Sequence, residues 1–265
     1  MLSHSGKIEE NIDLPIGKPS LVITGASGSL GRAIALQHAG PAVAMRLWGR
    51  DSDKLTETAA AVMAKGATER STVFDLTDVE AATKELLEQD ETERFNIAYL
   101  VAGSGEIRPE GALVESTEQI TRMALVNYAA PAAMAAALAD RMAKRGGGRI
   151  VLIGSAAGHH SLPSAPAYSS SKAGLARFAD ALRLGVNTHG VSVTLAAPGF
   201  IDTPKTRPQA DQRPFEISIE EAAKRIIQAG EQGKRHYVTP WQFRALQALD
   251  TLLPAPLRDA LLRKM

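Results

Sequence analysis

Hydrophobic and polar positions follow two alternating patterns along the chain. Short β-branched or apolar runs, typical of buried strands, are separated by longer Ala-rich stretches with apolar residues at helical spacing. We expect strands at Ser20–Thr24, Ala42–Trp48, Thr72–Phe74, Ile97–Val101, Arg149–Ile153 and Val191–Ala196. We expect helices between them at Leu30–Ala39, Asp53–Lys65, Val79–Glu88, Thr117–Lys144 and Ala167–Asn187. Such alternation builds βαβ units and predicts an α/β fold, a doubly wound parallel sheet with helices on both faces.

The pattern changes towards both ends of the chain. Residues 1–19 are polar and are expected to form an extension, followed by a single catalytic domain at 20–240. Within that domain, Asp202–Phe215 is rich in Pro, Lys, Arg and Gln and is expected to be a loop. A capping-box pattern at Ser218 and Glu221 then predicts a helix to about Gln228, with a short strand at His236–Thr239.

The tail at 241–265 has apolar residues at helical spacing until two prolines interrupt it. Leu246, Leu249 and Leu253 form this repeat, with Trp241 and Phe243 just before it. We expect the tail to pack on the domain or on a neighbouring subunit. A lid over a substrate pocket and a helix lying on a membrane surface are the alternatives.

The composition removes several classes of function. The chain has 265 residues, of which 45% are hydrophobic, and its formal net charge of +1 argues against a nucleic-acid surface. It has no cysteine, so disulfides, zinc–thiolate sites and a catalytic thiol are excluded. No metal site is expected, because no third ligand appears at a suitable spacing.

No segment is predicted to span a membrane. The most apolar run, 124–139, is short and is interrupted by Asn127, Tyr128 and Pro131, so we expect a buried helix. The first twenty residues contain no apolar stretch of the kind found in secretory signals. A cytoplasmic protein is therefore expected.

A glycine-rich loop, TGASGSLG at Thr24–Gly31, joins the first strand to the first helix. Glycines allow the backbone to approach a pyrophosphate, whose charge is favoured at a helix N-terminus. This placement predicts a Rossmann-type dinucleotide site, although a plain strand-to-helix turn is the alternative. The expected contacts with the cofactor in this loop are Gly25, Ser27, Gly28, Ser29, Leu30 and Gly31.

Other strand ends should face the same crevice, since ligands bind at the carboxyl ends of parallel strands. Asp75 follows the third strand, Ala102 and Gly103 follow the fourth, and Ser155 follows the fifth. Asp75 could accept a hydrogen bond from the adenine amino group. Alternatively, it caps the next helix together with Thr77.

Three side chains are candidates for the chemistry. Tyr168 and Lys172 are four residues apart on a predicted helix and so share one face, and Ser155 ends the preceding strand. A free tyrosine has a pKa of about 10, and an ammonium group within about 4–6 Å typically lowers it by 1–3 units. We therefore expect Lys172 to prepare Tyr168 for proton exchange, with Ser155 binding the substrate oxygen.

The order and spacing of these motifs resemble the short-chain dehydrogenase/reductase family over nearly the whole chain. The matching residues are Thr24–Gly31, Asp75–Thr77, Asn127, Gly154–Gly158, Tyr168–Lys172 and Pro198–Thr203. The resemblance implies Tyr168 as general acid/base, and Lys172 as the residue that lowers its pKa and binds the nicotinamide ribose. It also implies that Ser155 orients the substrate and that Asn127 holds a water in a proton relay from Lys172. The implied further cofactor contacts are Asp75, Leu76, Pro198, Gly199, Ile201 and Thr203.

Two departures from the family pattern stand out. The family's small reductases usually have glycine in place of Ser29, and the spacing TGxxGxxG is the form seen in nucleotide-sugar epimerases and dehydratases. The usual Asn-Asn-Ala-Gly after the fourth strand is here Leu100–Gly103, with Val101 in place of an asparagine. Contacts on the adenosine side are therefore expected to differ.

The end of the second strand bears on the choice of cofactor. NAD-preferring proteins carry an acidic residue there to bind the ribose 2′-hydroxyl, whereas this chain has Gly49 followed by Arg50. A guanidinium binds a 2′-phosphate well, so NADP(H) is favoured over NAD(H). Arg50 as a solvated charge is the alternative. An NADP(H) preference in turn indicates carbonyl reduction.

These observations predict an NADPH-dependent oxidoreductase acting on a small-molecule carbonyl or alcohol. A nucleotide-sugar epimerase or dehydratase and a non-catalytic NADP(H)-binding regulator are the alternatives. The substrate is not readable, although His159 and His160 would either contact it or form an exposed loop pair. The resemblance implies a homodimer or homotetramer that pairs through the helices at 117–144 and 167–187.

Overall fold

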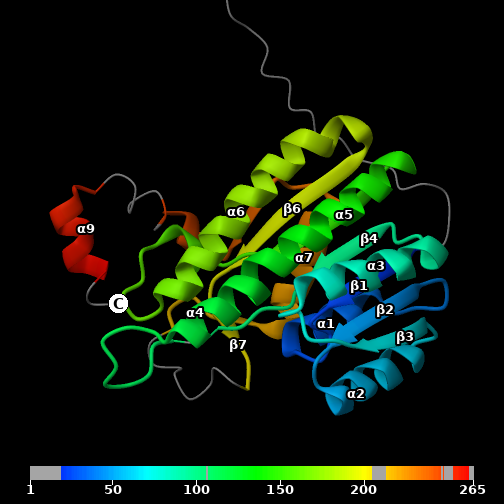
Figure 1. Cartoon of the computed structure of the whole chain (residues 1–265), viewed down its shortest axis with the longest axis horizontal. Coiled ribbons are helices and arrows are strands. Elements are labelled where there is room, and N and C mark those ends of the chain that lie inside the picture. The colour runs from blue at the N-terminus through cyan, green and yellow to red at the C-terminus, as the bar shows by residue number, and fades with distance from the viewer. Residues whose placement is uncertain (1–18, 106, 205–212, 246, 248–252, 263–265) are drawn as a thin grey trace, which may run out of the picture.

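The computed structural model describes residues 19–105, 107–204, 213–245, 247 and 253–262. Seven strands form one sheet in the order β3-β2-β1-β4-β5-β6-β9, and every neighbouring pair is parallel (Figure 1). The strands are β1 (Ser20–Thr24), β2 (Ala44–Gly49), β3 (Thr68–Val73), β4 (Ile97–Leu100), β5 (Gly148–Ile153), β6 (Val191–Pro198) and β9 (His236–Thr239). The strand order reverses between β1 and β4. The prediction of a single-domain, Rossmann-like α/β fold is confirmed.

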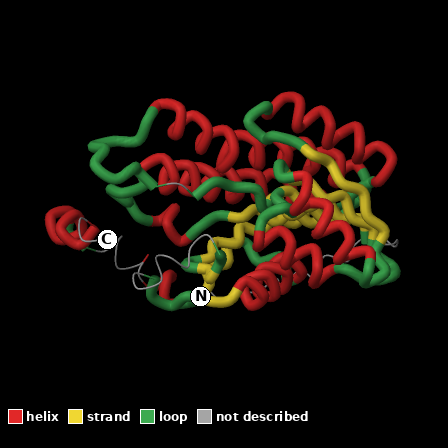
Figure 2. The backbone as a smooth tube through the Cα atoms, turned by 90° about the horizontal axis from the view of Figure 1, so that it is seen from below, coloured by secondary structure: helices red, strands yellow, loops and turns green. Residues whose placement is uncertain are grey.

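Helices cover both faces of the sheet, and Figure 2 shows them above and below the strands. One layer contains α1 (Ser29–His38), α2 (Ser52–Met63) and α7 (Ile219–Glu231). The other layer contains α3 (Val79–Glu93), α4 (Thr117–Ala124), α5 (Ala130–Lys144) and α6 (Pro166–Val186). The helices therefore exclude water from both faces of the sheet. This burial explains why most residues of the central strands are apolar, rather than every second one.

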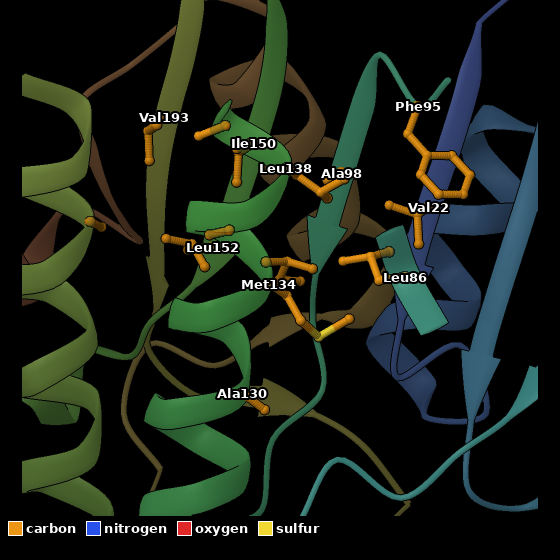
Figure 3. Close-up of a cluster of buried hydrophobic side chains, with 14 of the residues drawn as sticks. Val22, Leu86, Phe95, Ala98, Ala130, Met134, Leu138, Ile150, Leu152 and Val193 are labelled. Atoms are coloured by element: carbon orange, nitrogen blue, oxygen red, sulfur yellow. The ribbon is translucent and has the colours of Figure 1, made fainter. Parts of the chain in front are cut away.

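The larger core lies between the sheet and the layer that contains α5 (Figure 3). Met134 and Leu138 of α5 are fully buried against Ala98, Ile150 and Leu152 of β4 and β5. Each such side chain contributes about 1.5–3 kcal/mol when it is removed from water. This packing holds the carboxyl ends of β4 and β5 in fixed positions, and those ends carry candidate site residues.

The helix predicted at 117–144 is interrupted. A π-helical turn, η1 (Leu125–Ala129), separates α4 from α5. Taken as one 28-residue helix, the segment is long and apolar enough to cross a membrane by length and composition. However, 56% of its most apolar stretch is buried, because α5 packs on the sheet as a core helix.

Several other elements differ from the prediction. Helix α3 continues beyond the predicted Glu88 to Glu93. The third strand begins at Thr68 rather than Thr72, because β3 is an edge strand whose mostly exposed polar residues carry no apolar pattern. The stretch after residue 200 is not all loop, because β7 (Ile201–Asp202) pairs with β8 (Ile217–Ser218). Helix α7 begins after Ser218, whose side chain accepts from the Glu221 amide as predicted, but continues beyond Gln228 to Glu231.

In the described part of the tail, Phe243 packs on the domain. Phe243 is buried with Ala156, Ala197 and Val238. Trp241, predicted to pack in the same way, is 70% exposed. The short helix α9 (Ala255–Leu262) lies farther along the tail. The extension at 1–18, together with Leu246 and Leu249, lies outside the described residues.

Candidate active site

The glycine-rich loop between β1 and α1 is built on close backbone contacts. Gly25 has a φ of +72°, and a Cβ there would lie 2.9 Å from the backbone of Ala102. A Cβ at Gly31 would overlap the carbonyl of Gly25. Larger residues at Gly25 and Gly31 would therefore displace α1 or the end of β4. Ser29, where small reductases have glycine, is the first residue of α1 and has room for its side chain.

The loop forms one wall of a cavity of about 370 Å³ at the switch point between β1 and β4. Eleven of the predicted cofactor residues line this cavity: Gly25, Ser27, Gly28, Ser29, Leu30, Gly31, Arg50, Leu76, Ala102, Gly103 and Thr203. Six more residues complete the wall and were not among the predicted contacts: Thr24, Trp48, Gly49, Phe74, Val101 and Val126. Of these, Trp48 and Phe74 could have been found, because each directly precedes a strand-end residue that was selected. The glycine cradle and the helix N-terminus fit a dinucleotide.

The end of β2 meets this loop without room for a side chain. Gly49 is buried, and a Cβ there would lie 2.6 Å from the hydroxyl oxygen of Ser27. The next residue, Arg50, is exposed and lines the cavity. Asp51 then caps α2 by accepting from the Lys54 amide at 3.1 Å. The carboxylate of Asp51, the first acidic residue after β2, is therefore bonded to the first turn of α2.

Asp75 does not line the cavity and does not cap a helix. Its carboxylate accepts a hydrogen bond from the Thr77 amide at 3.0 Å and is otherwise exposed. The N-cap of α3 is Asp78, which accepts from the Ala81 amide at 3.0 Å. The cap is therefore Asp78 rather than the predicted Asp75, because the chain makes a tight turn before α3 begins.

The Thr24 hydroxyl ties the end of β4 to the end of β1. It accepts hydrogen bonds from the amides of Val101 and Ala102, at 3.1 and 3.2 Å. Thr24 belongs to the glycine-rich motif, so the end of β4 is anchored there although Val101 stands where the family pattern has an asparagine.

The structure brings Ser155 and Tyr168 together. Their hydroxyls are hydrogen-bonded, and the Ser155 oxygen also accepts from the Ala157 amide at 3.2 Å. Burial raises the pKa of Tyr168, while the hydrogen bond with Ser155 acts in the opposite direction. The expected lowering of this pKa by Lys172 is therefore wrong for the protein alone, because burial disfavours the charged phenolate more than its neighbours favour it.

Lys172 lies on the same helix and is almost fully buried. Its ammonium group donates a hydrogen bond to the Ile153 carbonyl at 2.8 Å. Burial lowers the pKa of Lys172 to about 8. A Cβ at Gly103 would lie 3.3 Å from the Lys172 nitrogen, so glycine leaves this nitrogen accessible from the end of β4.

Asn127 is fully buried in the π-helical turn η1. Its amide group exchanges two hydrogen bonds with the backbone of Ser104, at 2.7 and 2.8 Å, and donates a third to the Ser171 hydroxyl at 3.2 Å. A Cβ at Gly103 would lie 3.2 Å from its oxygen as well. Asn127 therefore lies beside Lys172, as the resemblance implied.

The predicted contacts at the end of β6 do not line the cavity, apart from Thr203. Gly199 donates to the Thr239 carbonyl at 2.8 Å, and Phe243 lies so close that a Cβ at Gly199 would overlap its ring. The carbonyl of Ile201 accepts a hydrogen bond from the Arg213 guanidinium. Pro198, Gly199 and Ile201 therefore position the segment that carries Thr203.

The histidine pair after Ser155 is not an exposed loop pair, since both residues are half-buried. The ring centroid of His159 lies 5.1 Å from that of His236, and its Nε2 is buried without a hydrogen-bond partner. Burial, then the nearby His236 and His160, lower the pKa of His159 to about 4. Among the residues that the structure describes, no cluster of three or more His, Cys, Asp or Glu side chains could hold a metal ion.

Comparison with known proteins identifies the fold and the family. An uncharacterized oxidoreductase of Myxococcus xanthus is 30% identical over 244 residues, covering 92% of this chain and 96% of that protein. The bovine dehydrogenase/reductase SDR family member 7B is 32% identical over 69% of this chain, which spans 58% of that longer protein. A short-chain dehydrogenase from Sphingobium yanoikuyae, solved in complex with NADPH, superposes with a TM-score of 0.76 at 25% identity, covering 89% of this chain and 96% of that one.

The family model described as short chain dehydrogenase matches residues 20–214. That range contains the glycine-rich loop, the cavity wall and the cluster of Ser155, Tyr168 and Lys172. The chain therefore belongs to the short-chain dehydrogenase/reductase family and is an NAD(P)-dependent oxidoreductase acting on an alcohol or carbonyl group.

Proposed function

We propose that the protein is an NADPH-dependent carbonyl reductase that uses Ser155, Tyr168 and Lys172. The observation that supports this function best is the hydrogen bond between the Ser155 and Tyr168 hydroxyls. Tyr168 lies on the same helix as the buried Lys172. Hydroxyl groups arranged in this way can bind one carbonyl oxygen together. Gly103 connects this cluster with the dinucleotide cavity, because it lines the cavity and lies beside the Lys172 nitrogen.

NADPH held by the glycine-rich loop and Arg50 would supply the hydride that the carbonyl carbon accepts. Tyr168 donates its proton to the carbonyl oxygen, so an alcohol and a tyrosinate result. The burial that raises the pKa of Tyr168 keeps the phenol protonated until that moment, which suits a general acid. Ser155 holds the substrate oxygen beside Tyr168. Lys172, whose pKa is about 8, is then able to return a proton towards Tyr168 near neutral pH.

Asn127 would complete the path for that proton. It lies beside Lys172 on the inner side of the helix and is fixed by three hydrogen bonds. In this proposal it holds a water that connects Lys172 with solvent. The rigid hold on its amide is consistent with orienting a water rather than binding substrate.

The preference for NADP(H) rests on the end of β2. Gly49 offers no carboxylate to the ribose, and Ser27 occupies the space that a larger side chain would need. The exposed Arg50 lines the cavity and is available to bind a 2′-phosphate. The related dehydrogenase from Sphingobium yanoikuyae was solved with NADPH, which agrees with this preference.

We also propose that the protein works in the cytoplasm as a homodimer or homotetramer, paired through the layer that contains α4, α5 and α6. Tyr128 and Leu184 are exposed on these helical segments and would contribute apolar area to such an interface. Light scattering of the purified protein would measure the assembly. A monomer at micromolar concentration would contradict the proposed pairing.

The function itself is tested by screening aldehydes and ketones for NADPH oxidation at 340 nm. We expect turnover of at least one class of carbonyl, with NADPH preferred over NADH. Tight NADPH binding without turnover of any carbonyl or alcohol would instead favour the regulatory alternative. Turnover of a nucleotide-sugar with no net oxidation of NADPH would favour the epimerase or dehydratase alternative.

A further inference from the structure

A buried glutamate is bonded to the start of the catalytic helix from a distant part of the chain. Glu115 precedes Ser116, the N-cap of α4, and is only 5% exposed. Its Oε2 accepts a hydrogen bond from the backbone amide of Ala167 at 2.8 Å. Its other oxygen, Oε1, is buried and has no hydrogen-bond partner. Burying a carboxylate is costly, so its placement calls for a favourable interaction at this point.

The start of α6 supplies that interaction because it lacks a cap of its own. The first amides of a helix have no acceptor within the helix, and a polar residue at the N-cap usually provides one. Here the N-cap is Ala165, whose side chain makes no such bond, and Pro166 follows it. Glu115, 52 positions away, takes over the capping role. Its negative charge is also favoured at a helix N-terminus.

The capped amide is adjacent to the proposed general acid. Ala167 immediately precedes Tyr168, and Lys172 lies one turn later on the same helix. A shift in the first turn of α6 would therefore move the Tyr168 hydroxyl relative to Ser155, which is held on a different element. Small displacements of this kind slow a reaction strongly, because a misplacement of about 1 Å can lower the rate about 100-fold.

The segment that carries Glu115 is anchored to the site at two further points. The Ser104 backbone exchanges two hydrogen bonds with the side-chain amide of Asn127, and the Arg108 amide donates to the Ser164 carbonyl at 2.9 Å. The segment after β4 is thus bonded to Asn127 near its beginning and to the start of α6 near its end. Among the described contacts of this segment, the bond from Ala167 to Glu115 is the one that reaches the first turn of α6.

We propose that Glu115 is a positioning residue for the reaction: by capping α6 it fixes Tyr168 against Ser155. This role rests on the proposed function, because the position of Tyr168 matters to the reaction only if Tyr168 exchanges the proton. It differs from the role of Asn127, because Glu115 acts through the backbone of the helix and lies outside the cluster of reacting groups.

Two substitutions separate capping from general stability. Glu115→Gln keeps an acceptor for the Ala167 amide, whereas Glu115→Leu has similar size and removes the acceptor. Glu118→Gln is the matched control, since Glu118 is an exposed glutamate in the first turn of α4. The four proteins are compared by kcat, by the dissociation constant for NADPH, and by amide hydrogen exchange in peptides covering residues 165–171.

In Glu115→Leu we expect exchange in that first turn to accelerate about 5-fold, the typical effect of losing a helix cap. We expect kcat to fall about 10-fold or more, with NADPH binding unchanged. Glu115→Gln should recover most of both losses, and Glu118→Gln should match the wild type. Peptides covering the first turn of α3, capped by Asp78, should exchange alike in all four.

The inference is overturned if Glu115→Leu keeps the wild-type kcat, or if its first turn of α6 exchanges at the wild-type rate. It is also overturned if Gln and Leu lose activity equally, since that would indicate a need for the charge rather than the cap. Failure of the proposed function looks different: the wild type would then turn over no carbonyl, while the exchange measurement would still decide whether Glu115 caps α6.

Discussion

The hydroxyl of Ser27 occupies the space next to Gly49, so that a Cβ at Gly49 would lie 2.6 Å from the Ser27 oxygen. An acidic residue at this position is the usual way to bind the ribose of NAD(H). In this protein, a side chain introduced at Gly49 would collide with that of Ser27. We expect Gly49→Asp alone to weaken binding of both cofactors and to reduce the free energy of unfolding by about 1–3 kcal/mol, as overpacking typically does.

Removing the obstacle should separate the steric effect from the charge effect. In the double variant Ser27→Gly with Gly49→Asp, we expect stability to return and NADH to bind more tightly than NADPH. Calorimetric titration with both cofactors measures this directly. If Gly49→Asp alone switches the preference without loss of stability, the contact with Ser27 does not limit this position.

Arg50 should act on NADPH alone. A charge-assisted hydrogen bond contributes about 1.5–3 kcal/mol, and about 1.4 kcal/mol corresponds to a factor of ten. Arg50→Ala should therefore weaken NADPH binding about 10- to 100-fold and leave NADH binding almost unchanged. Arg141→Ala, on the surface of α5, is the control and should change neither. Equal losses for the two cofactors would mean that Arg50 acts on the fold or on the shared adenosine.

Tyr168→Phe should remove proton donation while keeping the ring in place. We expect kcat to fall by about 10²–10⁴-fold, the range typical for a general acid, with NADPH still bound. Tyr237→Phe, on the edge strand β9, provides a tyrosine control and should remain active. Steady-state rates and cofactor fluorescence measure the two effects separately. Near-normal turnover by Tyr168→Phe would remove Tyr168 from the mechanism.

The buried ammonium of Lys172 should make stability depend on pH in a defined window. Its pKa is about 8 in the folded protein and 10.5 when exposed, so between these values the unfolded chain binds the extra proton. The penalty for burying the charge is complete below pH 8 and is relieved as the pH rises to 10.5. This corresponds to about 3 kcal/mol.

Comparison with Lys172→Met isolates this contribution, because other titrating groups are common to both proteins. We expect the free energy of unfolding of the wild type to rise relative to that of Lys172→Met by about 3 kcal/mol between pH 8 and 10.5. Urea unfolding at several pH values measures it. A difference that stays constant over this range would show that Lys172 keeps an ordinary pKa.

The tail should contribute to stability through Phe243. This residue is buried, and its ring lies edge-on to Phe200 and Phe215 at centroid distances of 5.9 and 6.2 Å. Phe243→Ala should cost about 3 kcal/mol, the lower end of the usual range, because the cluster is small. Trp241→Ala is the control: its side chain is exposed, so we expect a change within about 0.5 kcal/mol. Equal effects of the two would contradict packing through Phe243.

Much of the sheet could be predicted because its strands are buried on both faces. Every residue of β4 is buried, and the run Ile97–Leu100 is correspondingly apolar. The edge strand β3 lacks that signal, since residues such as Glu69 and Arg70 occur within it. The short β7 could not be predicted either, because two residues carry no periodicity and its partner lies fifteen or more positions away.

In the candidate site, too, local patterns could be predicted and contacts between distant residues could not. Tyr168 and Lys172 could be recognised because their spacing on one helix is local. The contribution of Glu115 could not, since its partner amide is distant in sequence and a glutamate before a helix usually looks like a solvated charge. Likewise, Ser27 lies in the loop after β1 and Gly49 ends β2, and only the packing of β1 beside β2 brings them together.

The π-helical turn η1 acts as a one-residue insertion in the long helix around Asn127. A π-helical turn is wider than an α-helical one, so it absorbs this extra residue and leaves α4 and α5 in nearly the relative rotation of a regular helix. Deleting one residue between Asn127 and α5 would restore a regular helix but bring Asn127 one residue closer to α5. With α5 held by the core, Asn127 would then move away from Ser104 and Ser171. Natural variation in the length of this segment should therefore be far less tolerated than substitutions along it.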